Sequence, residues 1–310
     1  MLHKETLILL ALTFLSIVSL SQENGKELLF ENTSYEFSYQ LDKPDRTWSL
    51  PKKLIEISGL SFIDDHRLAC VQDEKGKIYV FNMKSGKIEK KIDFAKDGDY
   101  EGIAIVRNDI WVLKSNGNLY RVKKYIKETQ AKAKKYSTLL SGKNDPEGLT
   151  YNPVDNQLLI ACKGHPFIDD REGKRYKAIY SFDLKTKQLD LEPFLLMDMD
   201  TIKYYKGYNA ITHLGVEFLA YLNTAKGDVS FQPSGMAIHP ISGNIFVLAS
   251  IGNLLVVYSR SGELLAMIEL KSKYHLKPEG ICFSPDATLY IANEGDDYRK
   301  GTILKFYTKN

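Results

Sequence analysis

The fold is indicated first by the stretch Asp145-Pro146-Glu147-Gly148-Leu149-Thr150-Tyr151, because four related stretches occur elsewhere in the chain. They are Glu56-Ile57-Ser58-Gly59-Leu60-Ser61-Phe62, Asp99-Tyr100-Glu101-Gly102-Ile103-Ala104-Ile105, Gln232-Pro233-Ser234-Gly235-Met236-Ala237-Ile238 and Lys277-Pro278-Glu279-Gly280-Ile281-Cys282-Phe283. Successive glycines of the five stretches lie 43, 46, 87 and 45 residues apart, and short apolar runs with Gly, Asn and Asp turns fill the intervals. A repeat of this length built from short strands is typical of a β-propeller with one blade per repeat.

The number of blades depends on the long interval of 87 residues between Gly148 and Gly235, which has room for a sixth blade. However, residues 165–177 form a charged insertion within the third blade. Further on, apolar residues recur at the three- and four-residue steps of one helix face, at Ile211, Leu214, Phe218 and Leu222. We therefore predict a helical insertion over residues 201–228 and an all-β, five-bladed propeller, with six blades as the alternative.

The N-terminus is predicted to be a secretory signal. Residues 1–21 combine a positive start at Lys4, an apolar run over residues 7–18, and small residues at Ser19 and Ser21. Cleavage before Gln22 would export the chain to the periplasm, the cell envelope or the medium. The run is shorter than the roughly 20 residues that a membrane span needs, which makes an uncleaved anchor the weaker alternative.

After the signal, residues 22–53 are assigned to an N-terminal segment and residues 54–310 to the propeller. The last repeat contains only three strand-like runs of its own. Residues 35–41 alternate apolar and polar side chains, and we predict that they form the outermost strand of the last blade. Such a strand would close the ring and remove an exposed sheet edge.

Composition excludes some functions. The net charge of +3 over 310 residues is too low for a nucleic-acid-binding face. The lysine-rich residues 123–135 are interpreted as a solvated excursion, with weak attraction to a cell membrane surface as the alternative. Cys70, Cys162 and Cys282 lie in apolar runs and are odd in number, which predicts buried free thiols.

The repeat also predicts a site. The residue before each glycine should lie at one mouth of the propeller channel, and these residues are Ser58, Glu101, Glu147, Ser234 and Glu279. The second strands should end at the same mouth, which adds Asp73, Glu74, Lys163 and Glu294. Crowded carboxylates must raise their pKa values, pair with lysine or bind a cation. Ca²⁺ suits scattered oxygen ligands best, whereas the alternative is that the glutamates merely accept hydrogen bonds at strand ends.

The run from Pro278 to Asp286, followed by residues 289–295, resembles an NHL-type propeller repeat. Together with Asp99-Tyr100-Glu101-Gly102 and Asp145-Pro146-Glu147-Gly148-Leu149, the set resembles the bacterial SdiA-regulated family over about residues 54–306. This resemblance implies a five-bladed propeller of the cell envelope with a calcium site, for which Glu101, Glu147 and Glu279 are the candidates. Ser58 and Ser234 depart from a full ring of glutamates. Propeller phytases and lactonase-like propellers are more distantly similar.

Two functions follow as expectations. The first is a binding module that holds a protein or a small molecule at a calcium-organised channel mouth. The second is a calcium-dependent hydrolase of phosphoesters or lactones, in which a carboxylate acts as base. His165 begins the insertion on the side of the glutamate ring and is considered as a catalytic residue, although an exposed histidine in a loop is usually only solvated.

Overall fold

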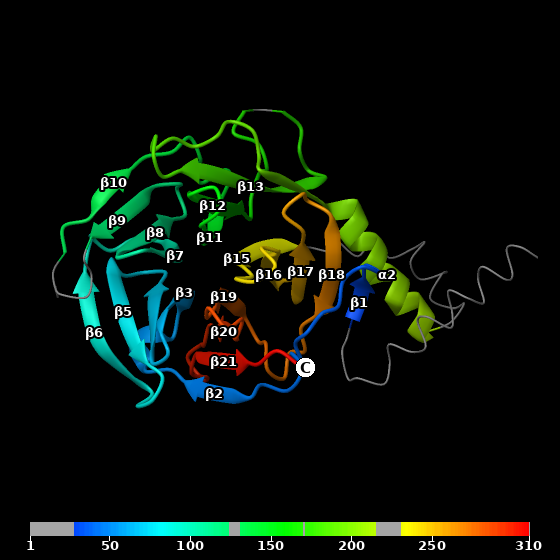
Figure 1. Cartoon of the computed structure of the whole chain (residues 1–310), viewed down its shortest axis with the longest axis horizontal. Coiled ribbons are helices and arrows are strands. Elements are labelled where there is room, and N and C mark those ends of the chain that lie inside the picture. The colour runs from blue at the N-terminus through cyan, green and yellow to red at the C-terminus, as the bar shows by residue number, and fades with distance from the viewer. Residues whose placement is uncertain (1–27, 124–130, 170, 215–230, 310) are drawn as a thin grey trace, which may run out of the picture.

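The computed structural model describes residues 28–123, 131–169, 171–214 and 231–309. Five antiparallel sheets surround a central axis, each with its first strand innermost, and Figure 1 looks down this axis. The prediction of an all-β, five-bladed propeller is therefore confirmed, and the six-bladed alternative is wrong. Residues 1–21, for which a signal is predicted, and residues 124–130 of the lysine-rich run lie outside the described residues.

The blades follow one another along the chain. Blade 1 contains β3 (Ile57–Asp64), β4 (Arg67–Gln72), β5 (Lys77–Asn82) and β6 (Lys87–Asp93). Blade 2 contains β7 (Tyr100–Val106), β8 (Asp109–Lys114), β9 (Leu119–Lys123) and β10 (Lys134–Tyr136). Blade 3 contains β11 (Pro146–Asn152), β12 (Gln157–Cys162), β13 (Tyr176–Asp183) and β14 (Leu195–Asp198). Blade 4 contains β15 (Gln232–Ile238), β16 (Ile245–Ile251), β17 (Leu254–Tyr258) and β18 (Leu264–Glu269). Blade 5 contains β19 (Pro278–Phe283), β20 (Leu289–Asn293) and β21 (Thr302–Phe306).

The ring is closed by β2 (Arg46–Ser49), which pairs antiparallel with β21 as the outermost strand of blade 5. Figure 1 shows the two strands side by side near the C-terminus. The prediction that residues 35–41 form this strand is wrong. Their alternation is nevertheless real, because Phe37, Tyr39 and Leu41 are buried in the core between blades 4 and 5. The segment fills a gap between blades without joining a strand ladder.

The insertion before blade 4 contains α2 (Met199–Leu214), which follows β14. It begins two residues before the predicted start, and Phe218 and Leu222 of the predicted helix face lie outside the described residues. The helix packs against β1 (Leu28–Glu31), a fifth strand on the outer edge of blade 4. The rings of Phe30 and Tyr205 make this contact, with centroids 4.2 Å apart. The described part of the insertion thus lies on the outside of the ring.

The apolar core consists of five clusters, each lying between two neighbouring blades. The repeated glycines permit the blades to meet near the axis. A Cβ atom at Gly102 would lie 2.6 Å from the Cβ of Leu149 in the next blade, and one at Gly235 would lie 2.4 Å from the carbonyl oxygen of Glu279. Only glycine fits such close backbone approaches, which explains the residue around which the repeat is built.

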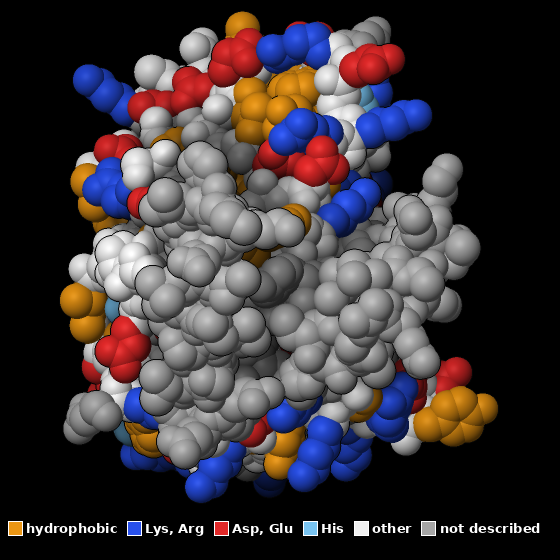
Figure 2. Space-filling model, turned by 90° about the vertical axis from the view of Figure 1, so that its right-hand side faces the viewer, with side chains coloured by type: hydrophobic (Ala, Val, Ile, Leu, Met, Phe, Trp, Pro, Cys, Tyr) orange, Lys and Arg blue, Asp and Glu red, His pale blue; other side chains and the backbone are white. Residues whose placement is uncertain are grey.

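The three cysteines and the charged side chains were considered in the sequence analysis. Cys70, Cys162 and Cys282 are buried and free, as predicted. In Figure 2 acidic and basic side chains are mixed along the upper edge of the view, whereas Lys and Arg predominate along the lower edge. No helix in the described part of the chain is long and apolar enough to cross a membrane.

Candidate functional site

The residue before each repeated glycine lies at an irregularity of the strand pairing. In blade 3, Pro146 pairs with Cys162 and Gly148 pairs with Ala161, which leaves Glu147 out of the ladder. The other blades show the same irregularity at Ser58, Glu101, Ser234 and Glu279. A β-bulge redirects the side chain of the extra residue. The five bulges therefore aim five side chains at one place.

These side chains line a cavity of about 160 Å³ at one mouth of the channel. Among the other predicted site residues, Asp73, Lys163 and Glu294 line the same cavity. Glu74 does not, because its side chain is 57% exposed and contacts Lys75 at 3.8 Å. The structure thus brings the predicted carboxyl groups together, with the exception of Glu74. We call this cavity the acidic mouth.

Glu147 is buried between a lysine and a second carboxyl group. Lys163 Nζ donates to its Oε1 at 2.8 Å, and Glu101 is hydrogen-bonded to its carboxyl group. Burial raises the pKa of Glu147, and Lys163 opposes this shift. Burial, followed by the charge of Glu147, raises the pKa of Glu101 to about 10. Glu101 therefore holds a proton at neutral pH, which prevents two negative charges from lying side by side.

Glu279 and Asp73 face the cavity from blades 5 and 1. Burial and then the charge of Glu147 raise the pKa of Glu279 to about 7, although Lys277, 4.0 Å away, opposes the shift. Burial and then the charge of Glu56 raise the pKa of Asp73 to about 6. The Oδ1 atom of Asp73 is buried without a hydrogen-bond partner among the described residues. A buried oxygen left in this way costs free energy unless a ligand completes its contacts.

The two serines of the ring have a structural explanation. Ser58 Oγ donates to the carbonyl oxygen of Tyr100 at 2.6 Å, and Ser234 Oγ donates to that of Pro278 at 2.7 Å. Each bond joins the innermost strands of two neighbouring blades, blades 1 and 2 in one case and blades 4 and 5 in the other. The backbone N–H of Ser250 also donates to Ser234 Oγ, at 3.1 Å. The serines therefore fasten blades together at the acidic mouth.

A second repeated position, not predicted above, lies three residues before each glycine, and two of its residues, Gln232 and Lys277, line the acidic mouth. Its members are Glu56, Asp99, Asp145, Gln232 and Lys277. Asp99 raises the pKa of Glu101, whereas Lys277 lowers that of Glu279. Lys277 also contacts the carboxylate of Glu294. Comparison of the five repeats at the position three residues before each glycine would have found these residues.

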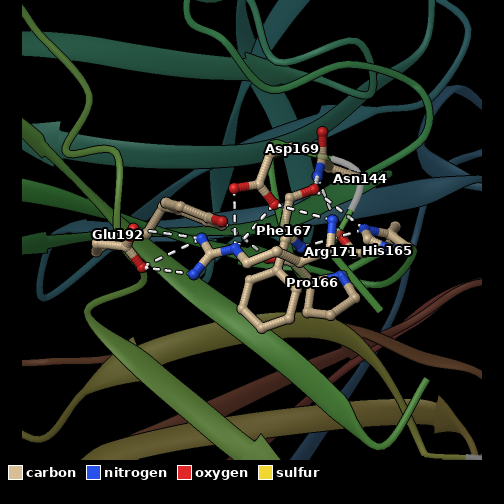
Figure 3. A network of polar contacts seen from close by, with 8 residues as sticks. Asn144, His165, Pro166, Phe167, Asp169, Arg171 and Glu192 are labelled. Atoms are coloured by element: carbon tan, nitrogen blue, oxygen red, sulfur yellow. Dashed lines mark hydrogen bonds and ion pairs between the residues drawn. The ribbon is translucent and has the colours of Figure 1, made fainter. Parts of the chain in front are cut away.

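His165 belongs to a separate network in the blade 3 insertion, shown in Figure 3. Its Nδ1 accepts from the backbone N–H of Phe167 at 3.2 Å. Asn144 Nδ2 donates to the carbonyl oxygens of both residues, at 3.0 and 2.8 Å. Arg171 of the same loop forms ion pairs with Asp169 and Glu192. His165 does not line the acidic mouth, and these contacts instead hold the fold of the loop.

Two observations bear on metal binding. In the residues that the structure describes, no three histidine, cysteine, aspartate or glutamate side chains form a ready-made metal site. The carboxyl groups of the acidic mouth are balanced instead by the proton on Glu101 and by the ammonium groups of Lys163 and Lys277. A cation at this mouth would have to replace a proton or a lysine contact.

Below the acidic mouth the channel is closed by apolar side chains. The free space among the innermost strands shrinks to about 10 Å³. One apolar residue per blade closes it, and these residues are Leu60, Ile103, Leu149, Met236 and Ile281. The two mouths of the channel are therefore separate compartments.

Comparison with known proteins gives a family and a fold. A family model described as SdiA-regulated matches residues 38–214, more than half of the chain. No curated protein matches. Among solved structures, Myxococcus xanthus glutaminyl cyclase is 9% identical with a TM-score of 0.55, and the match covers 86% of this chain and 96% of that one. A streptogramin B lyase is 12% identical with a TM-score of 0.48, over 84% and 97% of the two chains. At 9% identity, the similarity to the glutaminyl cyclase shows the fold alone.

Proposed function

Because the chain belongs to the SdiA-regulated family, we propose that it is a calcium-binding β-propeller of the cell envelope that holds a protein or small-molecule ligand at the acidic mouth. The observation that carries the proposal is the gathering of Asp73, Glu101, Glu147 and Glu279 in one cavity of about 160 Å³. Buried carboxyl groups are normally paired or bound to a metal. Here four blades direct such groups to one place.

The donor set fits calcium in its chemistry. All four acidic groups offer oxygen, and Ca²⁺ accepts six to eight oxygen ligands in flexible geometry. Glu101 and Glu279 would exchange protons for the cation, and the orphaned oxygen of Asp73 would gain a partner. Glu147 keeps its contact with Lys163. Bound calcium would supply positive charge that attracts carboxylate, carbonyl or phosphate oxygens of a ligand.

The test is a thermal unfolding curve with calcium and with chelator. Calcium at about 100 times its dissociation constant should add about 2.7 kcal/mol to the free energy of unfolding. Glu101→Gln and Glu279→Gln should remove this gain. Glu74→Gln is the matched control, because Glu74 is an acid of the same predicted ring that lies outside the cavity. An unchanged melting temperature would rule out calcium binding.

A calcium-dependent hydrolase of phosphoesters or lactones is the second candidate. It is favoured by the lining of the acidic mouth, because a substrate polarised by calcium there would lie beside carboxyl groups such as Glu279 that are able to act as the base. A set of phosphoester and lactone substrates, with Glu279→Gln as the disabled variant, decides between the candidates. Turnover that needs both calcium and Glu279 supports the hydrolase, whereas calcium binding without turnover supports the module.

Envelope location is a separate part of the proposal, supported by the features of residues 1–21. Fractionation of cells with mass spectrometry of the exported protein should find a chain that begins at Gln22. A chain that keeps residues 1–21 and stays with the membrane would favour the uncleaved anchor.

A further inference from the structure

The opposite mouth of the channel holds a second and larger cavity of about 370 Å³. The repeat builds it, because the residue three positions after each glycine lines it. These residues are Phe62, Ile105, Tyr151, Ile238 and Phe283. The apolar side chains that close the channel form its floor. Its volume lies in the range of roughly 300–1,000 Å³ that is typical of small-molecule sites. We call this cavity the apolar mouth.

The rim of the apolar mouth extends its apolar lining toward solvent. Val154, in the turn between β11 and β12, is 67% exposed. Pro240 lines the cavity, and the neighbouring Ile241 is 77% exposed. His239 adds no charge, because its Nε2 bonds to Tyr39 and its Nδ1 accepts from the backbone N–H of Ser242. Most of what an occupant would touch is therefore apolar.

One charged side chain, Arg260, is found among the described residues that line this cavity. Its Nη2 donates to Asp155 Oδ2 at 2.8 Å, and the two side chains are 43% and 41% exposed. A guanidinium group has five N–H donors in a planar fork that matches a carboxylate. The ion pair with Asp155 uses one edge of the guanidinium group and holds Arg260 at the rim of the cavity. The other donors are able to meet an anionic group that enters the mouth.

We propose that the apolar mouth is a binding site for a small, largely apolar molecule with a single anionic group. Its apolar body would displace water from the cavity, and its anionic group would contact Arg260. Because five blades enclose the cavity and its floor is closed, the occupant must enter from one end, which favours a small molecule. The site is separated by the closed channel from the acidic mouth and does not depend on calcium.

The probe for this site is 1-anilino-8-naphthalenesulfonate, an apolar fluorophore with one anionic group. The purified protein should bind one equivalent saturably, and decanoate should compete better than decanol. Arg260→Gln should weaken binding about tenfold, the expected loss for one charge-assisted contact. Asp155→Asn breaks the same ion pair but keeps Arg260, and it should leave binding unchanged or stronger.

Two further variants locate the binding. Val154→Asp places a negative charge on the exposed rim, where folding tolerates it, and should abolish probe binding. Glu279→Gln, at the acidic mouth, should leave probe binding unchanged, which separates this site from the proposed calcium site. Absence of saturable binding, or binding that survives both Arg260→Gln and Val154→Asp, would overturn the proposal. Binding that Arg260→Gln alone leaves intact would overturn the assignment of the anionic group.

Discussion

Glu101 and Glu279 occupy positions that cost free energy in the folded protein. Each lies at a β-bulge, is largely buried, and has its pKa raised well above the ordinary value of 4.5. A raised carboxyl pKa means that the fold opposes the charge that the unfolded chain would carry at neutral pH. Unfavourable arrangements of this kind are often retained where a protein has a function to perform. The acidic mouth is such an arrangement, because the charge of Glu101 is neutralised by a proton and not by a cationic side chain or a metal ion.

Glu101→Gln is expected to stabilise the calcium-free protein. Folding holds a proton on Glu101 up to a pKa of about 10, whereas the unfolded residue loses it near 4.5. At pH 7 to 8 this difference costs the fold on the order of 4 kcal/mol, and a neutral amide of the same shape avoids it. Urea unfolding at pH 7.5 with chelator should show a higher free energy of unfolding for the variant.

The control is Glu147→Gln, which removes the acid that Lys163 contacts at 2.8 Å. This change leaves the lysine without its carboxylate and should destabilise the protein. Two glutamates of one ring are thus expected to respond with opposite signs. Equal losses of stability from both variants would mean that Glu101 serves mainly as a structural hydrogen-bonding residue.

At the scale of elements, the repeated motif specified the inner strands well because its glycine has a geometric cause. Gly102 meets Leu149 of the next blade, and Gly148 meets Met236 of the blade after that. Such contacts recur once per blade, which is why the motif predicted five inner strands and the mouth that their ends form. The bulge at Glu147 was not predictable in the same way, because the extra residue shows only in the pairing with β12.

The N-terminal segment shows where the pattern is insufficient. Residues 35–41 and β2 both contain buried aromatic side chains, at Phe37, Tyr39 and Trp48. Alternation of apolar and polar side chains indicates an extended chain with one buried face, and residues 35–41 satisfy that condition. Which segment pairs with β21 is decided by tertiary contacts far away in sequence. The apolar mouth was not predicted for a related reason, since alternation along a strand does not show whether an apolar side chain faces the core or an open cavity.

The closing strand is expected to be important for stability because it joins the two ends of the chain. Trp48 of β2 is 7% exposed, and its Nε1 donates to the carbonyl oxygen of Met83 in blade 1 at 2.8 Å. Trp48→Ala should cost about 3–5 kcal/mol through the cavity it leaves. Trp48→Phe keeps most of the packing and should cost about 1–3 kcal/mol for the unpaired carbonyl. Thermal unfolding of both variants measures the two contributions, and an unaltered melting temperature in Trp48→Ala would show that β2 does not hold the ring closed.

At the scale of the whole molecule, the propeller has two chemically different ends. One mouth gathers carboxyl groups around a cavity of about 160 Å³, whereas the other is apolar and has about 370 Å³. Both arise from one strand per blade, because positions before the glycine face one end and positions after it face the other. The apolar side chains between them, Leu149 among them, keep the ends apart. Ligands at the two ends are therefore expected to bind independently.

The pH dependence of stability combines the charges of the whole molecule. Between about pH 5 and 7, folded Glu101 and Glu279 hold protons that the unfolded chain has released, and this lowers the free energy of unfolding as the pH rises. His275 acts in the opposite direction. Burial lowers its pKa from 6.5 to about 4, so that in this range the unfolded chain binds the extra proton and stability rises with pH. Asp73, whose pKa is raised to about 6, adds to the effect of the two glutamates, and His239, whose pKa burial lowers, adds to that of His275. The carboxyl groups outweigh the imidazoles.

We therefore expect the calcium-free protein to become less stable as the pH rises from 5 to 7, with each group contributing up to about 1.4 kcal/mol per pH unit. Urea unfolding in the presence of chelator across this range measures the slope. The double variant Glu101→Gln, Glu279→Gln should make this slope less negative, because it removes the two glutamates that oppose His275 and leaves the contribution of Asp73, whose pKa is about 6. The same slope in the parent protein and in the double variant would show that Glu101 and Glu279 are already ionised in the folded state.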